Sequence, residues 1–179
     1  MKFLETDLPG VLIVEPDVFR DQRGFFLETF RADRYRDGGI GFSFVQDNHS
    51  RSLRGTLRGL HAQRTRPQGK LVRVVRGEIF DVAVDIRPAS ATFGRWVGER
   101  LTADSFRQMF IPPGFAHGFC VLSEVAEVEY KCTDYYDRAD EIGARWDSAG
   151  IEWPIAHPLL SPKDAALPTL AELRRTLEG

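Results

Sequence analysis

Short apolar segments separated by glycine and proline run along the whole chain, and this punctuation constrains the fold more than any other feature. The 179 residues include 16 glycines and 10 prolines, which divide the apolar segments at fairly even intervals. Glycine and proline suit the turns between short strands, so the spacing is typical of a β-sandwich or barrel. The length is that of one ordinary domain, and we expect a single domain over residues 1–179. Strands are predicted over residues 10–15, 24–30, 43–48, 58–61, 71–75, 78–87, 96–101, 108–111, 116–122 and 125–133.

The segments between these strands predict short helices at the periphery of an all-β fold. Residues 32–37 and, more clearly, 170–177 have helical patterns, and Thr169 is placed to cap the second helix. Residues 153–168 are rich in proline and are expected to be irregular. The turn at 76–77, an arginine and a glycine, is expected to close a β-hairpin.

Charge and composition exclude several classes of protein. The chain carries 24 basic and 26 acidic residues, so it lacks the basic excess of a nucleic-acid-binding protein. No apolar run is long enough to span a membrane, and the N-terminus has no signal-peptide pattern. Cys120 and Cys132 are the two cysteines, both in strand-like segments, which predicts reduced thiols packed as small apolar groups. A soluble cytoplasmic protein is expected.

Ionisable side chains lie inside several of the apolar strands. His61, His117 and Tyr130 each interrupt such a segment, where a polar ring must find partners or cost stability. Lys70 follows the first histidine by a few residues. A histidine base, a lysine cation and a phenol are together suited to moving a proton to and from carbon.

The alternation of side chains along a strand places these groups. Tyr130 shares a face with Val128 and Cys132, and His117 shares one with Phe119, so both rings are expected to point inward. Arg58 and His61 lie on opposite faces of an ideal strand. They are able to serve one site only if the strand bends between them, at the intervening glycine.

Each of these groups also has a structural interpretation. A histidine in a strand is more often a hydrogen-bonded core residue than a catalyst, Tyr130 is compatible with a core aromatic, and Lys70 with a solvated strand end. The concentration of such groups favours a site. Further cations suggest an anionic ligand at the mouth of a barrel: Arg23, Arg58 and Lys163.

A metal centre is the main chemical alternative. Small metal-binding barrels of the germin kind use a paired His-x-His, but Gln63 takes the second position after His61. With His61 and His117, either Asp81 or Asp85 would complete a triad of two histidines and one carboxylate, so an iron site stays an alternative. We nevertheless expect no metal. Neither cysteine has an electropositive surrounding and no serine elbow is present, which argues against nucleophilic catalysis.

Eight motifs in order along the chain carry a resemblance to a known family. They cover residues 21–26, 44–50, 57–61, 68–73, 81–87, 111–119, 130–136 and 160–164. With these motifs the chain resembles the dTDP-4-dehydrorhamnose 3,5-epimerases, small jelly-roll barrels of the cupin kind, over nearly its whole length. It departs from the family at Ala62, where an aromatic residue is usual, and this bears on the shape of the sugar pocket.

The resemblance implies a role for each matching residue. His61 matches the general base and Asp164 the carboxylate that orients it. Tyr130 matches the acid that returns a proton from the opposite face, and Lys70 the cation beside the C4 oxygen of the sugar. Nucleotide- and sugar-binding positions are matched by Arg23, Glu28, Gln46, Asp47, Asn48, Arg58, His117, Glu141 and Lys163, and the aromatic that stacks on thymine by Tyr136.

The activity that the resemblance implies is inversion of C3 and C5 of dTDP-4-dehydro-6-deoxy-D-glucose through an enolate, by a homodimer without a cofactor. Removal of a proton beside a ketone requires stabilisation of the enolate, and inversion requires proton donors and acceptors on both faces. The alternatives are an epimerase acting on C3 or C5 alone, a noncatalytic sugar-nucleotide-binding barrel and a metal-dependent cupin oxygenase.

Overall fold

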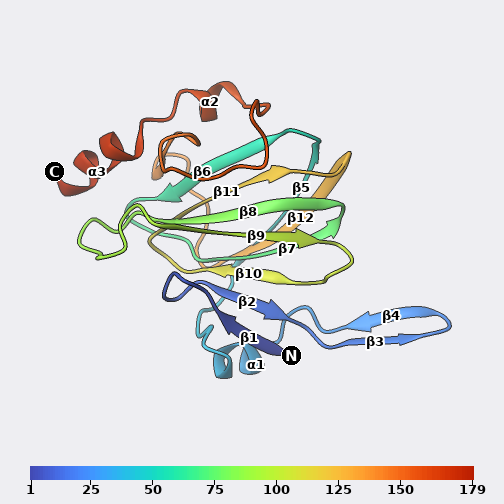
Figure 1. Ribbon diagram of the computed structural model, residues 1–179. Helices are drawn as coiled ribbons and strands as arrows, with labels where there is room; N and C mark the ends of the chain where they lie inside the picture. The colour runs from blue at the N-terminus through green and yellow to red at the C-terminus, as the bar shows by residue number, and fades with distance from the viewer.

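Two antiparallel β-sheets face each other in the computed structural model, which describes residues 1–179 (Figure 1). The larger sheet has the strand order β1 (Lys2–Glu5), β2 (Leu12–Glu15), β10 (Gln108–Ile111), β7 (Lys70–Arg76), β12 (Val125–Cys132) and β5 (Gln46–Leu53). The smaller sheet has the order β13 (Glu141–Gly143), β6 (Leu57–Gln63), β11 (Phe115–Val121), β8 (Glu78–Asp85) and β9 (Trp96–Thr102). The predicted all-β jelly roll is confirmed.

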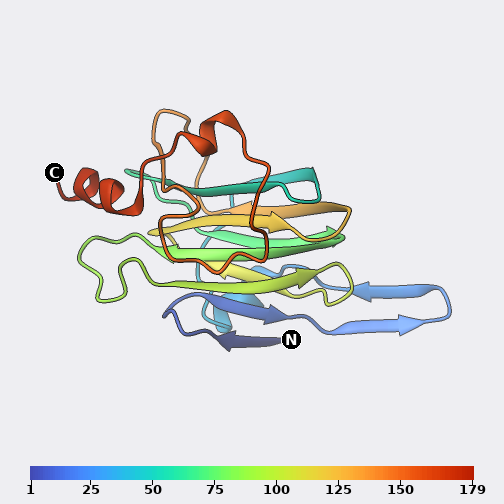
Figure 2. The ribbon, with the colours of Figure 1, turned by 45° about the horizontal axis from the view of Figure 1, so that its top comes forward.

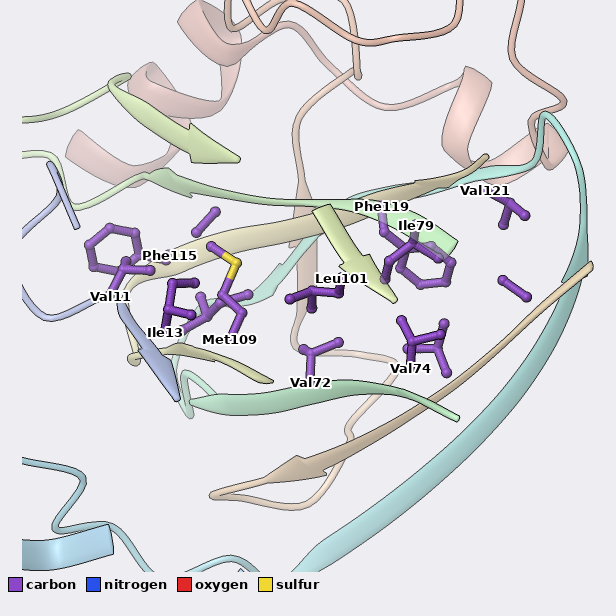
Figure 3. Packing of buried hydrophobic residues seen from close by; sticks show 14 of the residues in the cluster. Val11, Ile13, Val72, Val74, Ile79, Leu101, Met109, Phe115, Phe119 and Val121 are labelled. Atoms are coloured by element: carbon purple, nitrogen blue, oxygen red, sulfur yellow. The ribbon is translucent and has the colours of Figure 1, made fainter. Parts of the chain in front are cut away.

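The two sheets are held together by the apolar core between them. Val72 and Met109 from the larger sheet pack against Leu101, Phe115 and Val121 from the smaller one (Figure 3). Each of these side chains is buried, and full burial of a large apolar side chain stabilises a fold by about 1.5–3 kcal/mol. The core therefore fixes the distance between the two walls of the barrel.

The outer faces of both sheets are covered by peripheral segments. Helix α3 (Leu170–Glu178) packs Leu170 and Leu173 against the outer side of the smaller sheet. It begins with a capping box between Thr169 and Glu172, which confirms the predicted cap. Helix α1 (Ala32–Asp37) covers the larger sheet and buries Tyr35. None of the helices is long and apolar enough to cross a membrane.

A separate hairpin, β3 (Val18–Asp21) with β4 (Gly24–Leu27), extends away from the body of the molecule (Figures 1 and 2). Three of its phenylalanines are largely exposed to solvent: Phe19, Phe25 and Phe26. Large apolar side chains gathered on a projecting hairpin are unusual for an isolated chain and indicate a contact surface.

Several elements differ from their predictions. The turn at Gly77 does not close a hairpin, because β7 and β8 belong to different sheets and the chain crosses between the walls there. The strands β1, β3 and β13 and the four-residue helix α2 (Pro162–Ala165) were not predicted.

Strand β6 bends in the place that the sequence indicated. In its pairing with β11, His61 lies opposite His117 and Arg58 lies opposite Phe119, so β6 has one extra residue between the two pairs. Gly59 sits in this bulge with φ +129°, a conformation that favours glycine. The bulge turns both Arg58 and His61 toward the interior of the barrel.

Gly59→Ala is expected to destabilise the protein by about 2 kcal/mol or more, the scale of one strained backbone position with a steric clash. A Cβ atom at Gly59 would lie 2.5 Å from the Cα atom of Gly118 and 2.8 Å from the carbonyl oxygen of His117. Gly41→Ala is the matched control, because a Cβ there meets nothing within 4 Å. Urea unfolding followed by circular dichroism measures both, and equal effects of the two substitutions would contradict the bulge.

Candidate active site

A cavity of about 550 Å³ opens between the two sheets and has the size of a small-molecule site. It lies where the apolar core ends. On β12, alternate side chains point inward, with Val128 in the core and then Tyr130 and Cys132 at the cavity. On the neighbouring β7 it passes from Val72 to Lys70. The cavity wall includes eleven of the residues singled out from the sequence: Gln46, Asn48, Arg58, His61, Lys70, His117, Tyr130, Tyr136, Glu141, Lys163 and Asp164.

Three predicted binding residues lie outside this cavity. Asp47 alternates with Gln46 and Asn48 along β5, so its carboxylate points to the outer face and pairs with Lys131, at 2.9 Å from Oδ2 to Nζ. Arg23 lies in the turn of the projecting hairpin and is bound to Asp21. Glu28 follows that hairpin and lies beside Arg34. Within one chain the structure does not bring these three to the site.

His61 is oriented by a buried carboxylate. Its Nε2 lies 2.6 Å from Oδ1 of Asp164, which is 4% exposed. Asp164 is held in turn by α2, where its backbone N–H donates to the hydroxyl of Ser161. Burial opposes ionisation of Asp164, but the hydrogen bond and the charge of His61 outweigh burial and lower the pKa of this carboxyl. The carboxylate therefore fixes the imidazole ring in the cavity wall.

Tyr130 and Lys70 reach the cavity from the larger sheet, while His61 comes from the smaller one. Burial, together with the nearby Cys132, raises the pKa of Tyr130, so its phenol stays protonated and is available as an acid. Burial lowers the pKa of Lys70, and its Nζ donates to the carbonyl oxygen of His61 at 3.5 Å. An imidazole on one wall thus faces a phenol and an amine on the other.

The mouth of the cavity carries an aromatic ring in a polar network. Nζ of Lys163 lies 2.7 Å from both oxygens of Glu141, and the hydroxyl of Tyr136 donates to Glu141 at 2.8 Å. Burial opposes the ionisation of Glu141, but these partners lower its pKa. Tyr136 is itself about half exposed, so its ring is free to stack on a planar group.

Two glutamines hold the loop between β12 and β13, which carries Tyr136 at the mouth of the cavity. The backbone N–H of Tyr136 donates to Oε1 of Gln46, at 2.8 Å. Gln63, which the sequence analysis did not assign a role, accepts a hydrogen bond from the N–H of Asp137 and donates to the carbonyl oxygen of Tyr135. Gln63 lies two residues after His61 on the same face of β6, and this position was the available indication that it belongs to the site.

Asp81, which the sequence suggested only as a metal ligand, supports a residue of the cavity wall without lining the cavity itself. It is completely buried, and its Oδ1 lies 2.7 Å from Nε2 of His117. The alternation of side chains along β8 was the available indication that Asp81 points inward. Val82 and Val84 face the outer layer under α3, which leaves Asp81 on the inner face. No group of three or more His, Cys, Asp or Glu side chains is arranged to hold a metal ion.

Comparison with known proteins agrees with this geometry. A sequence model of the dTDP-4-dehydrorhamnose 3,5-epimerase family matches residues 5–172. The chain belongs to this family. It is an epimerase and therefore an isomerase-class enzyme, and its jelly roll is of the cupin kind, as the motifs predicted.

Individual members of the epimerase family are similar over nearly all of this chain. The dTDP-4-dehydrorhamnose 3,5-epimerase of Shigella flexneri is 55% identical over 92% of this chain and 93% of its own length. That of Neisseria gonorrhoeae is 52% identical over 98% of this chain, which spans only 55% of that longer protein. A Legionella pneumophila 3,5-epimerase, solved in complex with dTDP-4-keto-L-rhamnose, superposes with a TM-score of 0.92 and 50% identity over 96% of both chains.

The bond between Asp164 and His61 predicts a pH dependence of stability. Because the pKa of Asp164 is lowered in the folded protein, its contribution is present above the unfolded value near 3.8 and is lost as the pH falls through the folded value. We expect Asp164→Asn to be less stable than the unmodified chain by about 1 kcal/mol at pH 7. This difference should shrink below about pH 4.

Urea unfolding at pH 7, 5 and 3 measures this difference. The exposed Asp104 provides the matched control, since Asp104→Asn should change stability little at any of the three values. A difference for Asp164→Asn that stays constant or grows toward pH 3 would show that the ion pair does not stabilise the fold.

Proposed function

We propose that this chain inverts C3 and C5 of dTDP-4-dehydro-6-deoxy-D-glucose and so forms dTDP-4-dehydro-L-rhamnose, a precursor of L-rhamnose units. One observation carries the proposal: His61 with Asp164 lies on one wall of the cavity, and Tyr130 with Lys70 lies on the facing wall. Inversion of a carbon requires a proton to leave from one face and return to the other. Proton-transfer groups on opposite walls meet this requirement.

The proposed chemistry proceeds through an enolate at C4. His61 removes the proton beside the ketone, and Asp164 stabilises the imidazolium that results. Lys70 donates to the C4 oxygen, where one fixed donor typically lowers the barrier by about 3 kcal/mol. Tyr130 then returns a proton from the opposite face and is reprotonated from solvent. The reaction moves only protons, so the proposal includes neither a redox cofactor nor a metal.

The remaining cavity residues suit a nucleoside diphosphate. Arg58, His117 and Lys163 bring donors for the phosphates, and the half-exposed ring of Tyr136 suits stacking on thymine. The hydrogen-bonding side chains that complete this proposed subsite are Gln46, Asn48 and Glu141. Asp47 has a place at its edge only if it turns from its pair with Lys131. The Legionella relative was solved with a ligand of this type.

We propose that the working form is a homodimer in which the β3–β4 hairpin reaches the partner's site. Arg23 and Glu28 lie outside the cavity of their own chain, and the hairpin exposes Phe19, Phe25 and Phe26. Strand β5 is an open edge of the larger sheet and offers a place for another strand. In the same proposal the chain acts as one domain in the cytoplasm, where its two buried thiols stay reduced.

The function is tested by NMR of the 4-keto sugar nucleotide in deuterated water. We expect deuterium at both C3 and C5 together with the inverted product. Label at one carbon alone would mean a single-centre epimerase, and no label would refute the proposal. His61→Asn should lose more than about a hundredfold in turnover, the low end of general-base contributions, while still binding dTDP.

Two variants serve as references for His61→Asn. Asp164→Asn should lose activity less completely, because this residue orients the base and does not remove the proton. His157→Asn changes an exposed loop histidine outside the cavity and should retain full turnover. Near-normal turnover of His61→Asn would move the base elsewhere, with His117 as the next candidate.

Tyr130→Phe separates the acid from the base. If Tyr130 only returns protons, the variant should still exchange substrate protons with deuterated water through His61 but form little inverted product. Exchange and turnover are read from the same NMR samples. Equal loss of both would mean that Tyr130 is needed to form the enolate, and unchanged exchange and inversion would make Tyr130 a core aromatic.

The dimer is tested by complementation between two inactive variants. Arg23→Ala and His61→Asn are each expected to be weakly active as pure dimers. In mixed dimers one site combines the intact His61 of one chain with the intact Arg23 of the other. Refolding the two together should therefore restore roughly a quarter of full turnover, since half of randomly mixed dimers have one intact site of two.

Light scattering supplies the second measurement of the dimer. A mass of one chain at micromolar concentration with full activity would refute the dimer. A dimer that shows no complementation would place Arg23 in its own chain's site. Phe26→Glu, which puts a charge on the hairpin, should weaken association.

A further inference from the structure

Asp81 is a buried carboxylate whose hydrogen-bonding capacity is only half used. It lies on β8 at the inner face of the barrel and is completely buried. Its Oδ1 accepts a hydrogen bond from Nε2 of His117 at 2.7 Å, whereas Oδ2 is sealed from solvent and has no partner. Burying an ionised carboxylate is costly unless it is paired, so this residue calls for an explanation.

Asp85, four residues further along the same strand, shows what a purely structural carboxylate looks like here. It is equally buried, but its two oxygens accept five hydrogen bonds, from the backbone and guanidinium of Arg87 and from the hydroxyls of Ser90 and Thr92. These donors close the turn after β8 and lie away from the cavity. Asp81 has no such turn to close, and its one partner is a ring in the cavity wall.

His117 has one nitrogen bound and one free. Its Nε2 is bound to Asp81. No protein group bonds to Nδ1, and this nitrogen is not sealed from solvent, as Oδ2 of Asp81 is. The ring lies opposite His61 in the pairing of β11 with β6, and its centroid is 6.5 Å from that of Tyr130. Nδ1 is therefore the atom that His117 offers to a ligand.

The charge of Asp81 decides what Nδ1 does. Both nitrogens of an imidazolium are donors, whereas a neutral ring that donates from Nε2 has only an acceptor at Nδ1. An opposite charge within hydrogen-bonding distance favours the charged form of its partner. Burial lowers the pKa of Lys70 and so favours loss of its proton. The negative charge of Asp81 opposes this effect.

We propose that Asp81 is a positioning residue, which holds the His117 ring as a cation so that Nδ1–H donates a hydrogen bond to the diphosphate of the bound nucleotide. The inference rests on the proposed function, because that function supplies the diphosphate. It assigns Asp81 a role in substrate affinity, without contact to the substrate itself.

Asp81→Asn tests the proposal, since it keeps the shape of the side chain and removes its charge. Calorimetric titration should show dTDP binding weakened by about tenfold or more, the scale of one charge-assisted hydrogen bond, and thymidine binding nearly unchanged. A barrel that had merely loosened would bind both ligands less well. Asp85→Asn is the matched control, with lower thermal stability and unaltered dTDP affinity as its expected result.

The double variant shows whether Asp81 acts through the ring. His117→Gln alone and Asp81→Asn with His117→Gln should bind dTDP equally weakly, because the second change removes nothing further. Losses that add would overturn the proposal. So would unchanged dTDP affinity in Asp81→Asn, or a parallel loss of thymidine affinity.

A measurement on the unmodified protein avoids any effect of a substitution on folding. Nitrogen-15 NMR of the His117 ring in the dTDP complex should show protons on both nitrogens, with Nδ1 shifted when dTDP is added. A bare Nδ1, or one that does not respond to dTDP, would overturn the inference. These are binding experiments, so a chain that passed them but inverted neither carbon would refute the proposed function and leave Asp81 its role.

Discussion

Apolar packing between the two sheets is the interaction on which the rest of the structure depends. It sets the separation of the walls, and so the separation of His61 on β6 from Tyr130 and Lys70 on the facing sheet. Those three residues lie on well-paired strands whose inner rows begin in the core, as β7 and β12 do with Val72 and Val128. Groups held in this way lose little further freedom when a ligand binds, which is what proton transfer at a defined distance requires.

The same packing makes the cavity a place where charges must be paired. His61 has Asp164, Lys163 has Glu141 and His117 has Asp81. Each pair joins segments distant in sequence, so these contacts also hold the cavity wall in place. Lys70 and Arg58 are the exceptions. Lys70 reaches only a carbonyl oxygen and Arg58 only the hydroxyl of Ser52 within hydrogen-bonding distance, and the pKa of Lys70 falls with burial. A cation without a close carboxylate is well suited to meet negative charge that develops during a reaction.

In the proposed dimer, the projecting β3–β4 hairpin would account for the absence of Arg23 and Glu28 from the cavity of their own chain. Its exposed phenylalanines and the open edge at β5 belong to the same chain but do not meet within it. The edge at β5 and the unpaired hairpin would supply the two complementary parts of a symmetric contact. Arg23 and Glu28 are then accounted for by position, since they lie on or beside the segment that would cross.

The sequence by itself determined the all-β class, most strand positions, the helices at 32–37 and 170–177, and the inward direction of His117 and Tyr130. These follow from local rules: period-two alternation, turn residues and the cap at Thr169. Its ordered motifs also identified the family. Arg58 and His61 were known from the sequence to need a bend, and glycine at position 59 supplied it because only a residue without a side chain fits against Gly118.

Other features were decided by tertiary structure alone. The crossing between sheets at Gly77, the partnership of Asp81 with His117 and the exclusion of Asp47 from the cavity depend on which strands face each other across the barrel. Local sequence carries no record of that, because the same alternating strand is able to turn either face inward. On β8 the more apolar row, with Val82 and Val84, faces the outer layer under α3, and the row with Asp81 faces the interior. Part of what covers that outer row, helix α3, lies more than eighty residues further along the chain.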